Sequence, residues 1–324
     1  MGAFASRLGT RFLVVTVVPN ILFIGYVSLL LAAGAPTHSP SLKQALHVLN
    51  GITGNQVVAI ILGLLIISFA SHPLQIPLIQ LLEGYWWGLP FGPKMANRAT
   101  ERFRKELTKA QNELDKPESS AQDWWAKNAA RQARFRQDWL PERKADLLPT
   151  ELGNTLWTGE TTAGDRYELQ LTVALPRLIP LMSPIVFAEL SDRRNQLDAA
   201  VRLCVAAGAA TVVGVGLLLW HGGPWLFLAL ATYVLCWASY RAAVSAARGF
   251  STSLATAVDL YHLQLFDTLS LERPLDITEE RKRNKVLTKL FRGMILDDDD
   301  KKVLRYIPAK ADEAIAESGA KASS

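Results

Sequence analysis

The sequence is poor in the side chains from which catalytic and metal sites are most often built. It has only two cysteines and five histidines among 324 residues. None of the phosphate-loop, dinucleotide, zinc-protease, nucleophile-elbow or CxxC patterns occurs in it. Two isolated cysteines also exclude a thiolate cage for a metal ion. We therefore expect no catalytic residue, no cofactor and no metal site, and the sequence favours a protein that is not an enzyme.

Acidic residues are missing from the four long apolar stretches of the chain. Proton-coupled transporters commonly use carboxylates inside the membrane, so this class loses weight. A pore needs none, because backbone dipoles, polar side chains or hydrophobic constrictions can line it. The formal charge of +5 comes from basic residues in loops beside the apolar stretches. Membrane topology explains these residues without a nucleic-acid partner.

Two of the apolar stretches, at 203–220 and 225–240, form the predicted centre of the molecule. Each approaches the length of about 20 residues with which a helix crosses the hydrocarbon core. The sequence between them, His-Gly-Gly-Pro at 221–224, leaves room only for a tight turn, since its glycines and proline do not continue a helix. We therefore expect an antiparallel pair of membrane helices.

Both cysteines, Cys204 and Cys236, lie in this pair. Counted from the turn along the two helices, they should differ by roughly 7 Å in height. A disulfide between them is therefore not expected.

An earlier pair of apolar stretches supplies two further predicted spans, at about 12–35 and about 56–80. In the first of them Pro19 removes a backbone donor and should kink the helix. The neighbouring Asn20 offers a polar side chain that another helix could satisfy.

The second of these spans should be broken by Pro73 and Pro77, and the break carries His72. An ionisable group inside a membrane segment is a functional candidate. We favour the simpler interpretation, that His72 hydrogen-bonds a freed carbonyl at the interface. The candidates for a functional intramembrane site are His72, Pro73, Pro77, Pro19 and Asn20.

The distribution of lysine and arginine sets the expected orientation. The loop at 36–56 carries a single charge, Lys43, whereas basic residues flank the opposite ends of the spans, which places those ends in the cytoplasm. The sequence predicts an all-α protein of the cytoplasmic (inner) membrane, with four transmembrane helices in two pairs, a helical cytoplasmic insertion and both termini cytoplasmic. Its expected divisions are a first transmembrane pair at 1–82, the insertion at 83–198, the second hairpin at 199–240, a helical extension at 241–294 and a disordered tail at 295–324.

The insertion has the patterns of a folded helical region. Apolar residues at helical spacing predict a helix over about 93–116, and Ser120 begins a second one that reaches about Trp139. Residues 167–175 alternate between apolar and polar, which fits either a strand or an extended segment lying on the helices. The Ser-Pro pair at 183–184 opens a helix that runs into the third span.

Small residues recur every four positions on the third span and on the extension of the fourth. They are Ala206, Ala210 and Gly214, and then Ser245, Gly249, Ser253 and Ala257. Such stripes let helix backbones approach closely. The second stripe fits packing against the insertion, which we favour, or contact with another subunit. The expected partners are therefore the lipid bilayer and either a second copy or a cytoplasmic protein.

The C-terminal third contains one further predicted helix and one titratable group of residues. The helix begins at Thr278 and is closed by Gly293. Before it, Tyr261 and His262 lie near two aspartates. We expect these side chains to form a solvated helix face, because acid–base catalysis needs a pocket that spacing alone does not show.

Several short stretches resemble segments of an uncharacterised family of four-span bacterial membrane proteins. They are Leu-Leu-Glu-Gly-Tyr-Trp at 81–86, Gly-Asp-Arg-Tyr at 164–167, Pro-Arg-Leu at 176–178 and Pro-Leu at 180–181. The resemblance covers residues from about 60 to 290 and implies no catalytic residue and no substrate. In layout alone the chain is similar to bestrophin-type anion channels.

Three classes of function remain, in decreasing order of support. The first is a membrane protein without catalytic activity whose cytoplasmic region docks a partner or assembles with itself. The second is an oligomeric ion-conducting pore lined by the first two spans, and the third is an enzyme acting on lipid at the membrane interface.

The predicted topology can be tested with single-cysteine variants and an impermeant thiol reagent on intact cells. We expect modification of Lys43→Cys and Gly222→Cys, because both lie outside the cytoplasm in the predicted topology. Modification of Ala130→Cys or Leu290→Cys would contradict the topology.

Overall fold

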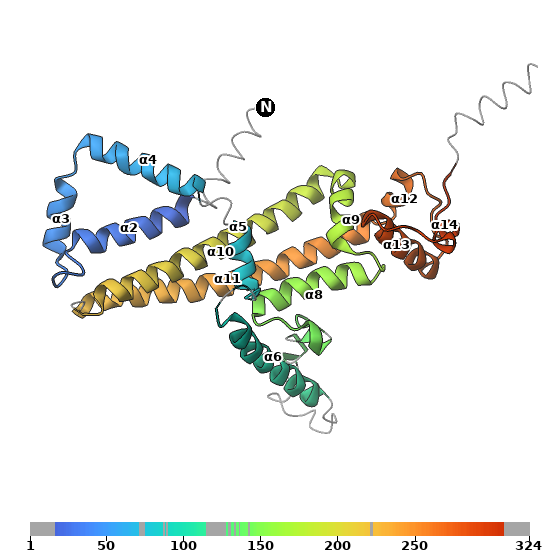
Figure 1. Ribbon diagram of the computed structural model, residues 1–324, viewed down its shortest axis with the longest axis horizontal. Coiled ribbons are helices and arrows are strands. Elements are labelled where there is room, and N and C mark those ends of the chain that lie inside the picture. Colours follow the sequence, from blue (N-terminus) through green and yellow to red (C-terminus); the bar gives the residue numbers. More distant parts are fainter. Residues whose placement is uncertain are drawn as a thin grey trace, which may run out of the picture. The chain divides into compact units, whose positions relative to one another are not determined.

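The computed structural model describes residues 17–70, 75–86, 88, 90–114, 128, 131–132, 134–135, 137–141, 143–220 and 223–307 (Figure 1). Every regular element within these residues is a helix, and an isolated bridge joins Leu271 to Tyr306. The predicted all-helical class is confirmed. The chain divides into two compact units, described separately below. Unit one combines residues 1–156 with 192–250, and unit two combines 157–191 with 251–324.

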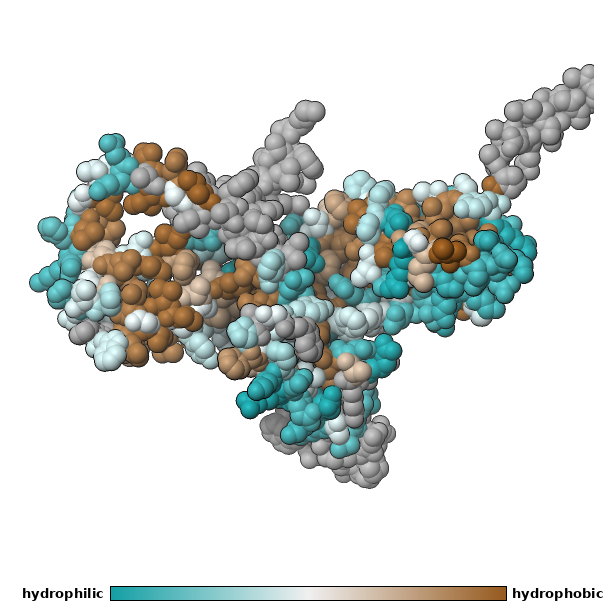
Figure 2. Space-filling model, in the orientation of Figure 1, coloured by the Kyte–Doolittle hydropathy of each residue, from teal (hydrophilic) through white to brown (hydrophobic). Residues whose placement is uncertain are grey.

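Unit one is built on the predicted helical hairpin. Its helices are α10, Pro184–Leu218, and α11, Leu226–Tyr261, and the short helix η6, Gly223–Trp225, joins them. Both long helices are long and apolar enough to cross a membrane. Figure 2 shows apolar side chains gathered near the turn, and Val212 and Phe227 are among those exposed there. An exposed apolar surface of this kind favours contact with lipid.

The register of the hairpin is fixed by a hydrogen bond between two hydroxyl groups. Thr211 Oγ1 donates to Thr232 Oγ1 over 3.0 Å. Arg202 lies nine residues before Thr211 and Arg241 nine residues after Thr232, so the two arginines stand at one level of an antiparallel pair. They are also the first charged residues on each helix, counted from the turn. The apolar stretches of α10 and α11 therefore end at the same height.

The expected separation of the two cysteines was too large. The sulfur atoms of Cys204 and Cys236 are 3.8 Å apart and share a thiol hydrogen bond, although both cysteines are free. By the threonine register, Cys204 is only three residues out of level with Cys236, which is about 4.5 Å of helix rise. The two cysteine side chains reach toward each other across this offset. The prediction counted only residues from the turn and left the direction of the side chains out.

Helix α2, Val18–Ala32, lies beside α10 and runs in the same direction. An added Cβ at Gly214 would lie 2.1 Å from the hydroxyl oxygen of Tyr26, so the glycine permits the contact between the helices. Nearer the turn, Leu30 and Leu218 are fully buried in one apolar cluster. The small-residue stripe of α10 thus faces α2 at Gly214.

Three further helices follow in this unit, α3, Leu42–Asn50, α4, Gly54–Ala70, and α5, Gln75–Glu83. The axes of α3 and the first part of α4 differ by 101°, so that this bent pair counts as a third span only if it is taken as one segment. Within the described residues, two helices therefore meet the length and composition of a span by themselves, and the predicted four spans in two pairs are not confirmed.

The break predicted in the second span would fall at 71–74, and these residues lie outside the described part of the chain. His72 and Pro73 lie outside the described residues. Pro77 is the third residue of α5, where the backbone N–H that a proline lacks would have no partner within the helix.

The part of the insertion that belongs to unit one contains α6, Gly92–Leu114, and a 3-10 turn, η4, at Lys144–Asp146. Helix α6 confirms the predicted helix at 93–116 as far as Leu114. The second predicted helix, from Ser120 to Trp139, lies mostly outside the described residues. Helix α8, Glu151–Asp165, leads from unit one into unit two.

Unit two consists of the end of α8, the outer ends of α10 and α11, and several short helices. These are α9, Leu171–Leu178, η5, Ile179–Leu181, α12, Gln264–Thr268, α13, Ile277–Phe291, and α14, Asp298–Val303. The predicted extended segment at 167–175 is wrong from Leu171 onward. There Leu171, Ala174 and Leu178 are buried at helical spacing against α13, a packing that overrides the alternating pattern. The predicted continuation of α11 past Tyr240 is confirmed as far as Tyr261.

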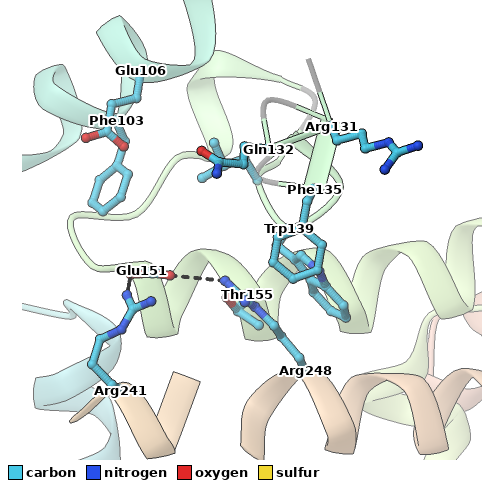
Figure 3. A pocket seen from close by; sticks show the side chains of 11 residues that line it. Phe103, Glu106, Arg131, Gln132, Phe135, Trp139, Glu151, Thr155, Arg241 and Arg248 are labelled. Carbon is cyan, nitrogen blue, oxygen red and sulfur yellow. Dashed lines mark hydrogen bonds and ion pairs between the residues drawn. The ribbon is translucent and has the colours of Figure 1, made fainter. Parts of the chain in front are cut away.

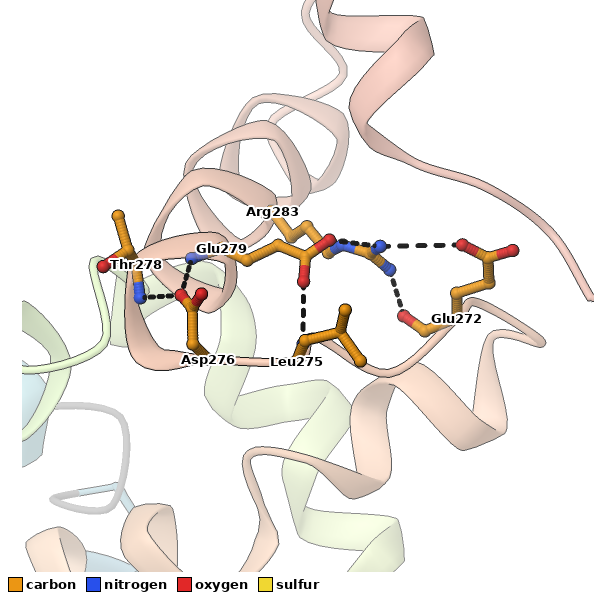
Figure 4. A network of polar contacts seen from close by, with 6 residues as sticks. All are labelled: Glu272, Leu275, Asp276, Thr278, Glu279 and Arg283. Carbon is orange, nitrogen blue, oxygen red and sulfur yellow. Dashed lines mark hydrogen bonds and ion pairs between the residues drawn. The ribbon is translucent and has the colours of Figure 1, made fainter.

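The start of α13 is held by a polar network at its first turn (Figure 4). Asp276 accepts hydrogen bonds from the backbone N–H groups of Thr278 and Glu279, and Glu279 accepts one from the N–H of Leu275. The bonds from the N–H groups of Glu279 and Thr278 hold the pKa of the Asp276 carboxyl below its usual range. Gly293 follows the helix with φ of 71°. Both ends of the predicted helix are confirmed.

The expected disordered tail is wrong for its first part. Residues 298–303 form α14, and Lys289 of α13 donates to both oxygens of Asp300 at 2.9 and 2.8 Å. This hydrogen bond raises the pKa of Lys289. The four aspartates thus begin a short helix, where their charge is favourable. Residues 308–324 lie outside the described part.

The contact between α2 and α10 predicts the effect of one added methyl group. Gly214→Ala should destabilise the protein by about 1–3 kcal/mol, because the Tyr26 ring must move away. The matched control is Gly216→Ala, two residues later, where an added Cβ meets nothing within 4 Å. Thermal unfolding in detergent measures both. Equal melting temperatures for the two variants would show that α2 does not pack on α10 here.

Candidate functional site

A pocket of about 790 Å³ lies in unit one, beside the part of α11 that follows its apolar stretch (Figure 3). Its lining comes from α6, from the segment at 131–140, from the start of α8 and from α11. The residues are Phe103, Glu106, Arg131, Gln132, Phe135, Trp139, Leu140, Glu151, Thr155, Arg241 and Arg248. Sequence reasoning named none of them as site residues.

One carboxylate on this pocket is shared by two arginines. Glu151 Oε2 accepts from Arg241 over 2.8 Å, and Glu151 Oε1 accepts from Arg248 over 3.1 Å. The arginines are seven residues apart on α11, so they lie on one face of the helix, two turns apart. Two guanidinium groups against one carboxylate leave a net positive charge. This side of the pocket therefore favours a negatively charged ligand.

Aromatic rings hold the second arginine in place. The guanidinium of Arg248 lies 4.9 Å from the ring centre of Phe135 and 5.7 Å from that of Trp139. Cation–π contacts of this geometry stabilise a partly desolvated guanidinium. The side chain of Arg248 is 22% exposed, whereas that of Arg241 is 52% exposed. Arg241 is thus the more accessible positive group.

Helix α8 is positioned by a joint with the end of α5. Thr150 Oγ1 donates to the carbonyl oxygen of Glu83 over 2.8 Å and accepts from the N–H of Gly153 over 3.0 Å. An added Cβ at Gly153 would lie 2.1 Å from that same carbonyl oxygen. Only glycine therefore fits, and the close approach fixes where Glu151 stands.

A second pocket, of about 170 Å³, lies between α2, α5 and α10. It brings together two of the predicted intramembrane candidates, Pro19 and Asn20, with the stripe residue Ala206. Its charged member is Arg202, which the sequence analysis missed because the residue precedes the apolar stretch at 203–220. One signal in the sequence could have indicated it, because Arg202 is the last charged residue before that stretch.

The other predicted helix-contact residues differ in burial. Ala210 and Ala257 are buried, and Ser245 is exposed. Gly249 lies beside the side chain of Arg193, 3.6 Å from the position an added Cβ would take. The stripe on α11 therefore meets different surroundings at each turn.

The expected solvated face around His262 is wrong. Its Nδ1 lies 2.5 Å from Glu280 Oε1, and the side chains of both residues are almost wholly buried. The ring of Tyr167 stacks on the imidazole with 4.0 Å between the centroids, and its hydroxyl donates to Asp259. Burial and, to a smaller extent, the hydrogen bond to Asp259 raise the pKa of Tyr167. These contacts join α11, α13 and the segment before α9 into one packed unit.

Within the described residues, no group of three or more histidine, cysteine, aspartate or glutamate side chains is placed to hold a metal ion. No family model, no curated protein and no solved structure matches this chain. The resemblance to a four-span bacterial family therefore stays a prediction.

The shared carboxylate predicts a difference between the two glutamates of the large pocket. Glu151→Gln should cost about 1–2 kcal/mol, because it leaves two guanidinium groups without their anionic partner. Glu106→Gln is the control, since the ion pair of Glu106 with Arg102 spans 3.7 Å on the surface. Melting temperatures in detergent report both effects. A loss for Glu106→Gln as large as that for Glu151→Gln would refute the structural role of the bridge.

Proposed function

We propose that this is a multi-pass membrane protein without catalytic activity that docks a protein partner in the large pocket of unit one. The observation that carries the proposal is the bridge of Glu151 to Arg241 and Arg248, which leaves positive charge on an accessible wall. The occupant that suits this wall is an acidic segment that also carries apolar side chains, since rings of Phe103, Phe135 and Trp139 share the lining.

The carboxylates of the pocket fit docking better than acid–base chemistry. Both oxygens of the Glu151 carboxylate already accept hydrogen bonds from arginines. Among the described residues that line the pocket, Glu106 is the other carboxylate, and none is a histidine or cysteine. The proposal of an enzyme acting on lipid is therefore the least supported of the three.

The proposed orientation follows the basic residues. We place the pocket on the cytoplasmic side of a bacterial inner membrane, with both termini on that side and four spans. In this orientation Arg202 and Arg241 mark the cytoplasmic ends of the apolar stretches, as the distribution of positive charge in membrane proteins favours. Assembly of several copies stays part of the proposal.

An ion-conducting pore is the second candidate. The observation in its favour is that Asn20 and Arg202 are polar members of an otherwise apolar pocket between α2 and α10. Single-channel recording with the purified protein in planar bilayers separates the two. Reproducible unitary currents would favour the pore over docking alone.

Docking can be tested with a photoreactive amino acid at position 132 in living cells. Gln132 lines the pocket, so we expect a covalent adduct with another protein. Arg241→Gln should reduce its yield about tenfold, because one charge-assisted contact is worth about 1.5–3 kcal/mol.

The matched control carries the same photoreactive group at Arg102, which is 81% exposed on α6 and does not line the pocket. Adducts of equal yield from positions 102 and 132, or adducts with lipid alone, would rule out docking of a protein in this pocket.

A further inference from the structure

Helix α3 is amphipathic, and most of its apolar face is exposed. Five of its nine residues are apolar, and they share an arc of about 160° around the helix. They are Leu42, Ala45, Leu46, Val48 and Leu49. Ala45 is buried, whereas the other four are between 46% and 61% exposed. Large apolar side chains gathered on one exposed helix face indicate an interaction surface.

Helix α3 begins at the level of the hairpin turn. Leu30 of α2 shares a buried cluster with Leu218 of α10, and Trp225 of the turn packs against that cluster. Ser41, the residue before α3, donates its N–H to the carbonyl oxygen of Ala33 over 2.9 Å. The start of α3 is therefore tied to the level at which the apolar stretches of the hairpin end.

The axis of α3 lies across the direction of the spans. It differs by 101° from the axis of the first part of α4. Figure 1 shows α3 lying across the end of α2, which runs beside α10. Helices α10 and α11 are long and apolar enough to cross a membrane. In a bilayer that they cross, α3 lies along the surface, at the boundary between hydrocarbon and water.

The two sides of α3 are arranged as this position requires. Ala45 marks the side that packs on the protein, and α2 is the helix packed against α3. Leu42 and Leu49 lie within about 60° of Ala45 around the helix, whereas Lys43 and His47 lie about 160° away from it. Because α2 leads from α3 along the hairpin, the leucines are on the hydrocarbon side. The lysine and the histidine are on the side of the water.

The polar side also distinguishes α3 from a span. If α3 and the first part of α4 formed one bent span, four exposed polar residues of α3 would enter the hydrocarbon. They are Lys43, Gln44, His47 and Asn50. An ionisable side chain in that position is costly. At the surface the same side chains meet headgroups and water, and Lys43 can approach anionic lipid.

We propose that α3 is an interfacial helix whose apolar face inserts into the bilayer beside the hairpin turn. The occupant of this face is the phospholipid surface, into which such a helix sinks by about 5–10 Å. The helix thereby anchors the connection between α2 and α4 in the plane of the membrane. The inference rests on the membrane character proposed above and does not depend on the docking of a protein in the large pocket.

The depth of α3 can be measured with an environment-sensitive fluorescent amino acid at position 49. The full-length protein is placed in nanodiscs of phosphatidylcholine and phosphatidylglycerol, which leave both membrane faces open to solutes. Two quenchers are compared, bromine on the acyl chains and iodide in the water. We expect bromine near the headgroups to quench the label and iodide to have little effect, because Leu49 should lie about 5–10 Å within the boundary.

The matched control carries the label at Lys43, which is also exposed on α3 but lies on its polar side. Iodide should quench this label, and brominated chains should not. A second control carries the label at Val212, which is 73% exposed within the apolar stretch of α10. Brominated chains should quench it if the hairpin lies in the bilayer.

Three results would overturn the interfacial helix. Equal quenching by iodide at positions 49 and 43 would show that both sides of α3 face water. Protection of position 49 from both quenchers would show that protein, such as a second copy, covers the apolar face. Absence of bromine quenching at position 212 would remove the hairpin from the bilayer, and the membrane proposal would fall with it. Bromine quenching at 212 without quenching at 49 would refute the role of α3 alone.

Discussion

The register of the α10–α11 hairpin is the constraint on which both pockets depend. The hydroxyl pair Thr211 and Thr232 sets it, and a shift of one residue would move α11 by about 1.5 Å along α10. Because the register is set, Arg202 and Arg241 stand at one height on different helices. One arginine lines the pocket beside α2, and the other lines the pocket beside α8. The two charged sites are thus consequences of a single helix–helix packing.

Much of the fold could be predicted because the decisive signals are local. The His-Gly-Gly-Pro sequence predicted the hairpin, and the Ser-Pro pair at 183–184 predicted the start of α10. The prediction of an extended segment at 167–175 failed because it relied on a local pattern, the alternation of apolar and polar residues. Helix α9 is instead stabilised by burial of Leu171 and Leu178 against a helix more than a hundred residues later. The predicted distance between the two cysteines was wrong for a related reason, since the true distance depends on how the side chains cross between the helices.

The sites were less predictable than the fold. Pro19 and Asn20 were found because polar and helix-breaking residues are conspicuous within an apolar stretch. The sequence did not indicate the ion-paired group of Glu151, Arg241 and Arg248. Its carboxylate contacts two arginines that lie some ninety residues away in the chain. No spacing rule brings such residues together. The burial of His262 was missed in the same way, because its partner Glu280 belongs to another helix.

Helix α5 connects the large pocket and the pocket that contains Arg202. Its Leu78 lines the small pocket, and five residues later the carbonyl of Glu83 anchors the joint that positions Glu151. The joint tolerates little movement, because Gly153 approaches that carbonyl more closely than any side chain allows. A displacement of α5 would therefore carry the first turn of α8, and with it Glu151, in the same direction.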